Sequence, residues 1–202
     1  MGRTSTARER LLEAAGDLLQ TRGYGSLGVA EICTRAEVKK GSFYHFFESK
    51  QALTAEAATA YWHQQRACWT AELAGPDPAL IRLRRVLAAL TAAQHAHKET
   101  NGTVDGCLLG NLALELSTQE PDVRACLANA FDEQTALITA TLLTAAAEGD
   151  IPPHHATSAT ARAVIAQLEG LVLFAKLRND PSVLDTLWSG TLLLLGADPD
   201  RP

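Results

Sequence analysis

Apolar residues recur along almost the whole chain at steps of three and four positions, the spacing that places side chains on one face of an α-helix. The first such segment covers residues 6–22, and its apolar face is formed by Leu11, Ala15, Leu18 and Leu19. Gly23 and Gly25 follow it, and glycines of this kind commonly end a helix. The pattern therefore begins with a single amphipathic helix.

The same periodicity predicts eight further helices and no strand. Ser26 is expected to cap a short second helix, and Ser49 a long fourth helix that runs to Leu73. The other expected helices cover residues 40–46, 78–98, 107–117, 121–147, 157–179 and 182–195. We predict an all-α protein with nine helices, divided into a domain of residues 1–50 and a domain of residues 51–202.

Residues 27–47 form a helix, a tight turn and a second helix, with a supporting helix on each side. This is the helix-turn-helix arrangement, in which the second helix enters the major groove of DNA. The residues expected to fill its small core are Val29, Ile32, Val38, Phe43 and Phe47. The residues left on or near the outer face are Lys39, Lys40, Ser42, Tyr44, His45 and Phe46.

The chemistry of this outer face suits a duplex. Lysine ammonium groups and a tyrosine hydroxyl bind phosphate oxygens, whereas Ser42, His45 and Lys40 are placed to test base edges. Gly41 has no side chain, so the backbone can come close to the DNA. Lys50 lies in the first turn of the fourth helix, where backbone N–H groups also favour an anion.

The net charge supports this interpretation only when residues 1–50 are counted separately from the rest of the chain. Residues 1–50 hold eight Lys or Arg and six Asp or Glu, a net charge of +2, whereas residues 51–202 hold ten and seventeen, a net charge of −7. Together they give the −5 of the whole chain. Positive charge is therefore concentrated in the quarter that carries the helix-turn-helix, as nucleic-acid binding requires.

The segments "RLLEAAGDLLQTRGYGSLGVAEI" and "VKKGSFYHFFESKQAL" resemble the DNA-binding domain of TetR-family transcriptional repressors over residues 6–53. The resemblance implies a homodimer that binds palindromic operator DNA and is released by an effector that binds the C-terminal domain. It implies DNA contacts from Lys39, Lys40, Gly41, Ser42, Tyr44, His45 and Lys50.

The chain departs from the family pattern at three places. Glu37 stands where the family usually has glycine in the turn, and Leu27 and Gly28 stand where Thr or Ser is common. Phe46 is bulky at a position that is often polar, and either contacts a thymine methyl group or shields the core.

The last two helices carry wide apolar faces, which favours a four-helix interface built from two subunits over a simple internal core. The residues expected on the first of these faces are Val164, Leu168, Leu171, Val172 and Ala175. Those expected on the second are Leu187, Trp188, Leu192, Leu193 and Leu195.

Cys107 opens the helix "CLLGNLALEL", where the helix dipole and free N–H groups favour a thiolate. Asp105 would oppose that charge, and Lys176, expected to face inward from an apolar helix, would support it. "DGCLLGNLALEL" also resembles a branch of TetR-like repressors that sense electrophiles or oxidants through such a cysteine. The competing interpretation is a buried, unreactive cysteine with Lys176 extended to solvent.

A reversible ligand is the alternative effector. The fourth to eighth helices offer Trp62, Trp69 and Phe131, with Tyr61, as pocket lining. Glu115, Asp132, Glu133 and Glu169 either include a group that orients such a ligand or lie on solvated helix faces.

Other features exclude several classes of protein. Cys33, Cys68 and Cys126 are widely spaced and are assigned structural roles, and no spacing typical of a disulfide scaffold or a zinc site occurs. We expect a cytoplasmic protein with no metal, no cofactor and no membrane-spanning segment.

Two alternatives to a DNA-binding repressor stay open. An all-helical enzyme would place its active site in the C-terminal helices, but no nucleophile–base pair or phosphate loop is present in the sequence. A scaffold that keeps the fold without binding DNA is the other. We therefore expect a regulator and not an enzyme.

Overall fold

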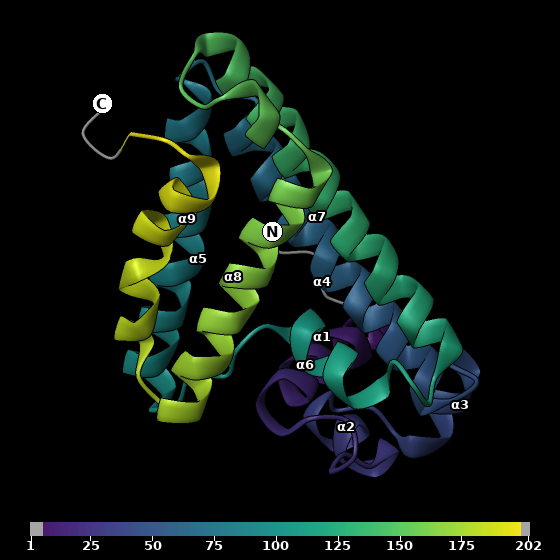
Figure 1. Cartoon of the computed structure of the whole chain (residues 1–202). Helices are drawn as coiled ribbons and strands as arrows, with labels where there is room; N and C mark the ends of the chain where they lie inside the picture. Colours follow the sequence, from purple (N-terminus) through teal and green to yellow (C-terminus); the bar gives the residue numbers. More distant parts are fainter. Residues whose placement is uncertain (1–5, 199–202) are drawn as a thin grey trace. The chain divides into compact units, whose positions relative to one another are not determined.

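The computed structural model describes residues 6–198 and contains, within them, nine α-helices, two 3-10 helices and no strand (Figure 1). The α-helices are α1 (Ala7–Arg22), α2 (Val29–Arg35), α3 (Lys40–Phe46), α4 (Lys50–Leu73), α5 (Ala79–Asn101), α6 (Leu108–Leu116), α7 (Pro121–Glu148), α8 (Ser158–Arg178) and α9 (Leu187–Leu195). The 3-10 helices are η1 (Pro153–His155) and η2 (Pro181–Thr186). The predicted all-α class and nine-helix order are confirmed.

The chain forms two compact units. The first contains the residues up to Gln64 together with Cys107–Ala130, and the second contains Gln65–Gly106 together with the residues from Phe131 onward. The unit that holds the helix-turn-helix therefore also contains α6 and the beginning of α7. The sequence-based boundary at residue 50 stays a prediction.

The local sequence explains where the helices of the first unit begin and end. Thr6 caps α1 in a capping box: its hydroxyl accepts the Glu9 N–H, and the Glu9 carboxylate accepts the Thr6 N–H. Ser49 caps α4 as predicted, since its hydroxyl accepts the Ala52 N–H at 3.0 Å. Ser26 does not cap α2, because its hydroxyl donates to the Arg22 carbonyl and the N-cap is Gly28.

The helix-turn-helix core is largely the one expected. Ile32, Phe43 and Phe47 are buried, whereas Val29 and Val38 are half-buried. A cluster of aromatic rings helps to hold α3 in place: the ring centroids of Phe43 and Phe47 lie 5.8 Å apart.

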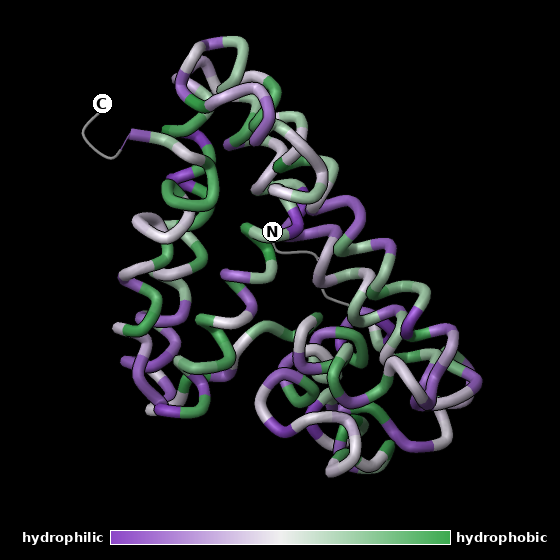
Figure 2. The backbone as a smooth tube through the Cα atoms, viewed as in Figure 1, coloured by the Kyte–Doolittle hydropathy of each residue, from purple (hydrophilic) through white to green (hydrophobic). Residues whose placement is uncertain are grey.

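In the second unit α8, η2 and α9 pack against one another and α5 packs against η2 and α9. Figure 2 shows that α9 is mostly hydrophobic along its length. The expected interface residues are mainly internal, and the buried ones are Val164, Leu168, Val172, Ala175, Leu187 and Leu195. The large apolar side chains that stay exposed on these two helices are Leu173, Phe174, Leu177 and Leu193. The four-helix interface between two subunits stays a prediction: Leu193 is exposed in the single chain, whereas the buried set packs within it.

Two boundaries differ from the predicted ones. α5 continues to Asn101 because Gly102 adopts a left-handed conformation and its N–H bonds to the Lys98 carbonyl, which closes the helix there. The last predicted helix is divided, since Asp180 caps the 3-10 helix η2 before α9 begins.

Among residues 6–198 one helix, α8, is long and apolar enough to cross a membrane by length and composition alone. An 18-residue window of this helix has a mean hydropathy of 1.3, whereas the sequence predicted no membrane-spanning segment. A third of that window is buried, and α8 packs against η2 and α9.

Candidate nucleic-acid interface

The outer face of α3 is open to solvent. Lys39, Lys40, Tyr44 and His45 are exposed, Gly41 is exposed beside them, and Ser42 is half-buried. The two lysine side chains make no hydrogen bond or ion pair with other residues in the described part of the chain. α3 therefore presents cationic, hydroxyl and imidazole groups to a partner while Phe43 anchors it from below.

Lys50 differs from the other predicted contact residues. Its ammonium group donates to the carbonyls of Tyr24 and Leu27, at 3.0 and 2.9 Å, and lies 3.6 Å from the centre of the Tyr24 ring. Burial lowers the Lys50 pKa, and this is opposed by the negative charges of Glu115 and Glu120. The structure therefore places Lys50 in contact with the loop between α1 and α2, a role that the sequence did not indicate.

The structure shows the backbone conformation or the burial of the residues that depart from the family pattern. Glu37 has a φ angle of 54°, a left-handed conformation that favours glycine, and its N–H bonds to the Thr34 carbonyl. Leu27 is buried and cannot reach a phosphate. Phe46 is half-buried, and its ring and that of His45 lie in an edge-to-face arrangement with a centroid distance of 5.3 Å, so its role stays open.

Cys107 is the N-cap of α6. Its sulfur accepts the Gly110 N–H at 3.5 Å, and its side chain is half-buried. A hydrogen bond from a backbone N–H to sulfur favours the thiolate over the thiol. The predicted position of Cys107 at a helix start is therefore confirmed, while its reactivity stays a prediction.

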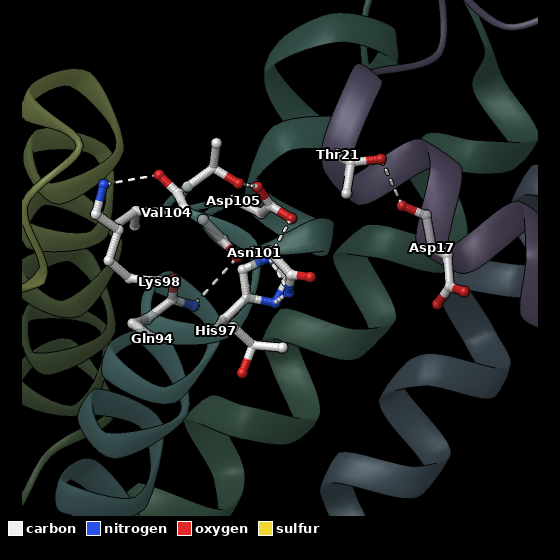
Figure 3. Close-up of polar contacts among 12 residues, drawn as sticks. Asp17, Thr21, Gln94, His97, Lys98, Asn101, Val104 and Asp105 are labelled. Carbon is white, nitrogen blue, oxygen red and sulfur yellow. Dashed lines mark hydrogen bonds and ion pairs between the residues drawn. The ribbon is translucent and has the colours of Figure 1, made fainter.

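Asp105 is buried, and charged side chains at such positions need partners. Its carboxylate lies 2.6 Å from His97 Nε2 and accepts the Thr103 hydroxyl at 2.9 Å, as Figure 3 shows for the His97 contact. The carboxylate that was expected to oppose a thiolate at Cys107 is thus engaged with an imidazole and a hydroxyl.

The loop that carries Asp105 is also fixed by its backbone. Asn179, at the end of α8, accepts the Val104 N–H at 2.9 Å and donates to the Gly102 carbonyl at 3.1 Å. Lys98 donates to the same carbonyl at 2.7 Å (Figure 3). The segment that precedes Cys107 is therefore held to α5 and α8 by side-chain hydrogen bonds.

The other predicted sensor residues lie in different places. Lys176 is exposed on α8, so the expectation of an inward-facing lysine is wrong. Cys107 belongs to the first unit and Lys176 to the second, and their pairing stays a prediction. Trp62 is buried in the first unit, whereas the buried Trp69 and the half-buried Phe131 belong to the second, so their common pocket also stays a prediction.

The second unit contains an open groove of about 620 Å³ between α5 and the segment η2–α9. Thr91, Trp188 and a His95–Asp185 pair, with 3.2 Å between Nε2 and Oδ1, line it. None of the predicted sensor residues lines this groove. It mixes charges of both signs, since Arg84, Glu99 and Asp185 line it.

The other three cysteines differ in how far they are buried. Cys33 is buried, and burial raises the pKa of its thiol, which favours the unreactive protonated form. Cys126 is half-buried and Cys68 is exposed. Among the described residues no group of three or more His, Cys, Asp or Glu side chains is placed to hold a metal ion.

Sequence reasoning missed Glu115. Its carboxylate was assigned either to a ligand pocket or to a solvated helix face, yet it accepts the backbone N–H groups of Tyr24 and Gly25. These partners lie about 90 positions earlier in the chain, and no local pattern marks them.

Comparison with known proteins adds independent information. Residues 11–57 match the family of bacterial regulatory proteins named tetR, and residues 79–190 match the tetracyclin repressor-like C-terminal domain. The transcriptional regulator AcuR of Cereibacter sphaeroides is 33% identical over 183 residues, which cover 89% of this chain and 81% of AcuR.

Solved structures agree with the sequence matches. A TetR regulatory protein from Rhodobacter sphaeroides superposes with a TM-score of 0.83 at 30% identity, covering 93% of this chain and 97% of that one. The reduced form of Escherichia coli NemR superposes with a TM-score of 0.80 at 25% identity, covering 96% and 98%. The chain, with its helix-turn-helix followed by a helical C-terminal unit, therefore belongs to the TetR family of transcriptional regulators.

Proposed function

We propose that the protein is a homodimeric repressor whose two α3 helices enter successive major grooves of a palindromic operator. The exposed outer face of α3, on which the Lys39 and Lys40 side chains make no hydrogen bond or ion pair with residues 6–198, is the observation that carries this proposal. DNA supplies the phosphate oxygens that such ammonium groups bind.

The side chains of this face divide into two roles. Lys39, Lys40 and the Tyr44 hydroxyl bind phosphates and set the position of the helix on the duplex. Ser42 and His45 contact base edges, and Gly41 allows the backbone to approach. Lys50 reaches the DNA only if it leaves the Tyr24 and Leu27 carbonyls, so we assign it mainly to the loop.

The homodimer is proposed to use the apolar side chains that α8 and α9 leave exposed. These are Leu173, Phe174, Leu177 and Leu193. Burying them against the same face of a second copy removes apolar surface from water and brings two recognition helices to one duplex. Such a dimer acts in the cytoplasm, binds no metal or other cofactor and needs no enzymatic activity.

A salt titration tests the operator proposal. Replacing Lys39 and Lys40 together by alanine is expected to weaken operator binding more than roughly tenfold, since charge-assisted bonds to phosphate are lost. The slope of log affinity against log salt should fall by up to about 3.6 for a dimer, at about 0.9 for each phosphate contact. Fluorescence anisotropy with a labelled operator measures both quantities.

Arg124→Ala is the matched control, because it removes an exposed cation that lies outside the recognition helix and outside the proposed dimer face. It should leave affinity and salt slope unchanged. An unaltered slope in the double variant would contradict the proposed contacts. Equal affinity of the wild-type protein for operator and random duplex would favour the scaffold alternative.

We also propose that electrophiles release the operator by modifying Cys107, as the resemblance of its segment to electrophile-sensing repressors implies. The Cys107 sulfur attacks the β-carbon of an α,β-unsaturated carbonyl compound and forms a carbon–sulfur bond. The π electrons of the carbon–carbon double bond move to the α-carbon, which takes up the proton that the thiol released. The thioether sulfur of the adduct carries a bulky substituent and is a weaker acceptor than a thiolate, so the bond from the Gly110 N–H that caps α6 is weakened.

N-Ethylmaleimide, a Michael acceptor, is a suitable probe. It is expected to weaken operator binding of the wild-type protein and to have no effect on Cys107→Ser, as measured by anisotropy with mass spectrometry to locate the adduct. Cys68→Ser controls for the exposed thiol and should respond like the wild type. A full response in Cys107→Ser would refute the sensor role.

A further inference from the structure

The loop between α1 and α2 is held by a single carboxylate on one side. Glu115 Oε2 accepts the Tyr24 N–H at 2.8 Å, and Glu115 Oε1 accepts the Gly25 N–H at 2.5 Å. Both oxygens are thus used on two successive backbone donors. Charge-assisted bonds of this kind are among the stronger hydrogen bonds in proteins.

The opposite side of the same loop is held by a cation. Lys50 donates to the carbonyls of Tyr24 and Leu27, and its ammonium group lies over the Tyr24 ring. Burial raises the Tyr24 pKa, and the charges of Glu120 and Glu115 raise it further. The phenol under the Lys50 ammonium group therefore stays protonated and neutral. Glu115 and Lys50 therefore grip the N–H and C=O groups of one short loop from opposite sides.

Glu115 is itself held firmly. It lies in the last turn of α6, between the fully buried Leu112 and Leu116, which fix that helix in the first unit. A carboxylate on such a helix has little freedom to follow the loop if the loop moves. Helices α1 and α6 lie close together in Figure 1, in agreement with their contact.

The loop determines where the helix-turn-helix begins. Its buried Leu27 and the N-cap Gly28 lead directly into α2, and the Glu37 turn connects α2 to α3. A displacement of the loop backbone therefore moves the start of α2, and with it the face of α3.

We propose that Glu115 is a positioning residue for operator binding: by holding the Tyr24 and Gly25 amides opposite Lys50, it fixes α2 and α3 in the arrangement that reads a specific sequence. The inference rests on the operator-binding function proposed above. Glu115 touches no DNA in this role and acts through the loop.

Gly25 supports the proposal independently. A Cβ atom at this position would lie 3.0 Å from Glu115 Oε1, closer than side-chain carbons normally approach, although the backbone of Gly25 is not left-handed. An added Cβ would therefore have to shift the Glu115 carboxylate by a few tenths of an ångström, whereas the backbone conformation itself tolerates a side chain. At Gly16, in α1 of the same unit, an added Cβ meets nothing within 4 Å.

The test compares two ways of disturbing the carboxylate with two matched controls. Glu115→Ala removes the acceptor, and Gly25→Ala displaces it without changing any charge. Asp122→Asn removes an exposed carboxylate of the same unit, and Gly16→Ala adds a methyl group to α1 in that unit without a close contact. Anisotropy with the operator and with a random duplex gives specific and non-specific affinities for each variant, and hydrogen exchange follows the Tyr24 and Gly25 amides.

Glu115→Ala and Gly25→Ala are expected to weaken operator binding about tenfold, the effect of losing charge-assisted bonds, while non-specific binding changes little. Their Tyr24 and Gly25 amides should exchange faster, and both controls should behave like the wild type. Wild-type operator affinity in either variant, together with accelerated exchange, would overturn the positioning role. If Glu115→Ala does not fold, the comparison of Gly25→Ala with Gly16→Ala decides the question alone.

The outcomes separate this inference from the operator proposal. If the wild-type protein does not discriminate operator from random duplex, operator binding has failed. If the wild type discriminates and all four variants do so equally, only the role of Glu115 has failed.

Discussion

Helices α3 and α6 are both short and both belong to the first unit, yet they use their side chains in opposite ways. α3 buries Phe43 and presents its polar residues to solvent, so its proposed partner lies outside the chain. α6 buries four leucines, and its polar ends are used inside the protein: the Cys107 sulfur caps its start, and Glu115 binds the α1–α2 loop. A helix that recognises a partner needs polar side chains that are free to bind it. A helix that supports the fold instead uses the polar side chains at its ends for bonds within the protein.

The largest effect is expected on stability, from a substitution on the buried face of α3 compared with one on its exposed face. Phe43→Ala removes a fully buried ring and is expected to lower the free energy of unfolding by about 3–5 kcal/mol. Tyr44→Ala, at a neighbouring side chain that is 58% exposed, should change it by less than about 0.5 kcal/mol while weakening operator binding. Chemical denaturation and anisotropy measure the two quantities. Similar losses of stability in both variants would mean that the faces are not separate.

A smaller effect is expected at the turn that connects α2 to α3. Glu37→Gly should raise the free energy of unfolding by about 1 kcal/mol, because a left-handed φ angle is costly for a residue with a Cβ atom. Glu37→Ala is the matched control, since it removes the charge but keeps the Cβ atom, and should bring no such gain. Equal stabilisation by alanine and glycine would assign the effect to charge instead of backbone conformation.

The contrast between α3 and α6 also explains how much the sequence predicted. The bounds of α3 were predicted correctly, and its inward residues Phe43 and Phe47 are buried, because the periodicity of apolar residues decides these features. Ser26 was assigned wrongly as a cap because its hydroxyl has a competing acceptor, the Arg22 carbonyl, which periodicity does not reveal.

The grip of Glu115 and the placement of Lys50 could not be predicted in the same way. Both depend on backbone groups of Tyr24, which carry no side-chain signature and come close only after α6 and α4 have packed in the first unit. Lys50 was assigned to DNA by analogy, and the analogy could not show that two carbonyls compete for its ammonium group. Lys176 was expected inside because its neighbours are apolar, yet the exposed side of α8 is itself apolar around Leu173 and Leu177.

The exposed apolar side chains of α8 and α9 make the proposed dimer sensitive to dilution. In that proposed dimer Leu173, Phe174, Leu177 and Leu193, which one chain leaves exposed, would be buried, and mass action would then make the melting temperature depend on the protein concentration. In a sample diluted far enough to separate the subunits, these apolar side chains would be exposed to water. The number of copies in a cell would therefore set not only how much repressor is present but also how steeply operator occupancy rises with each further copy.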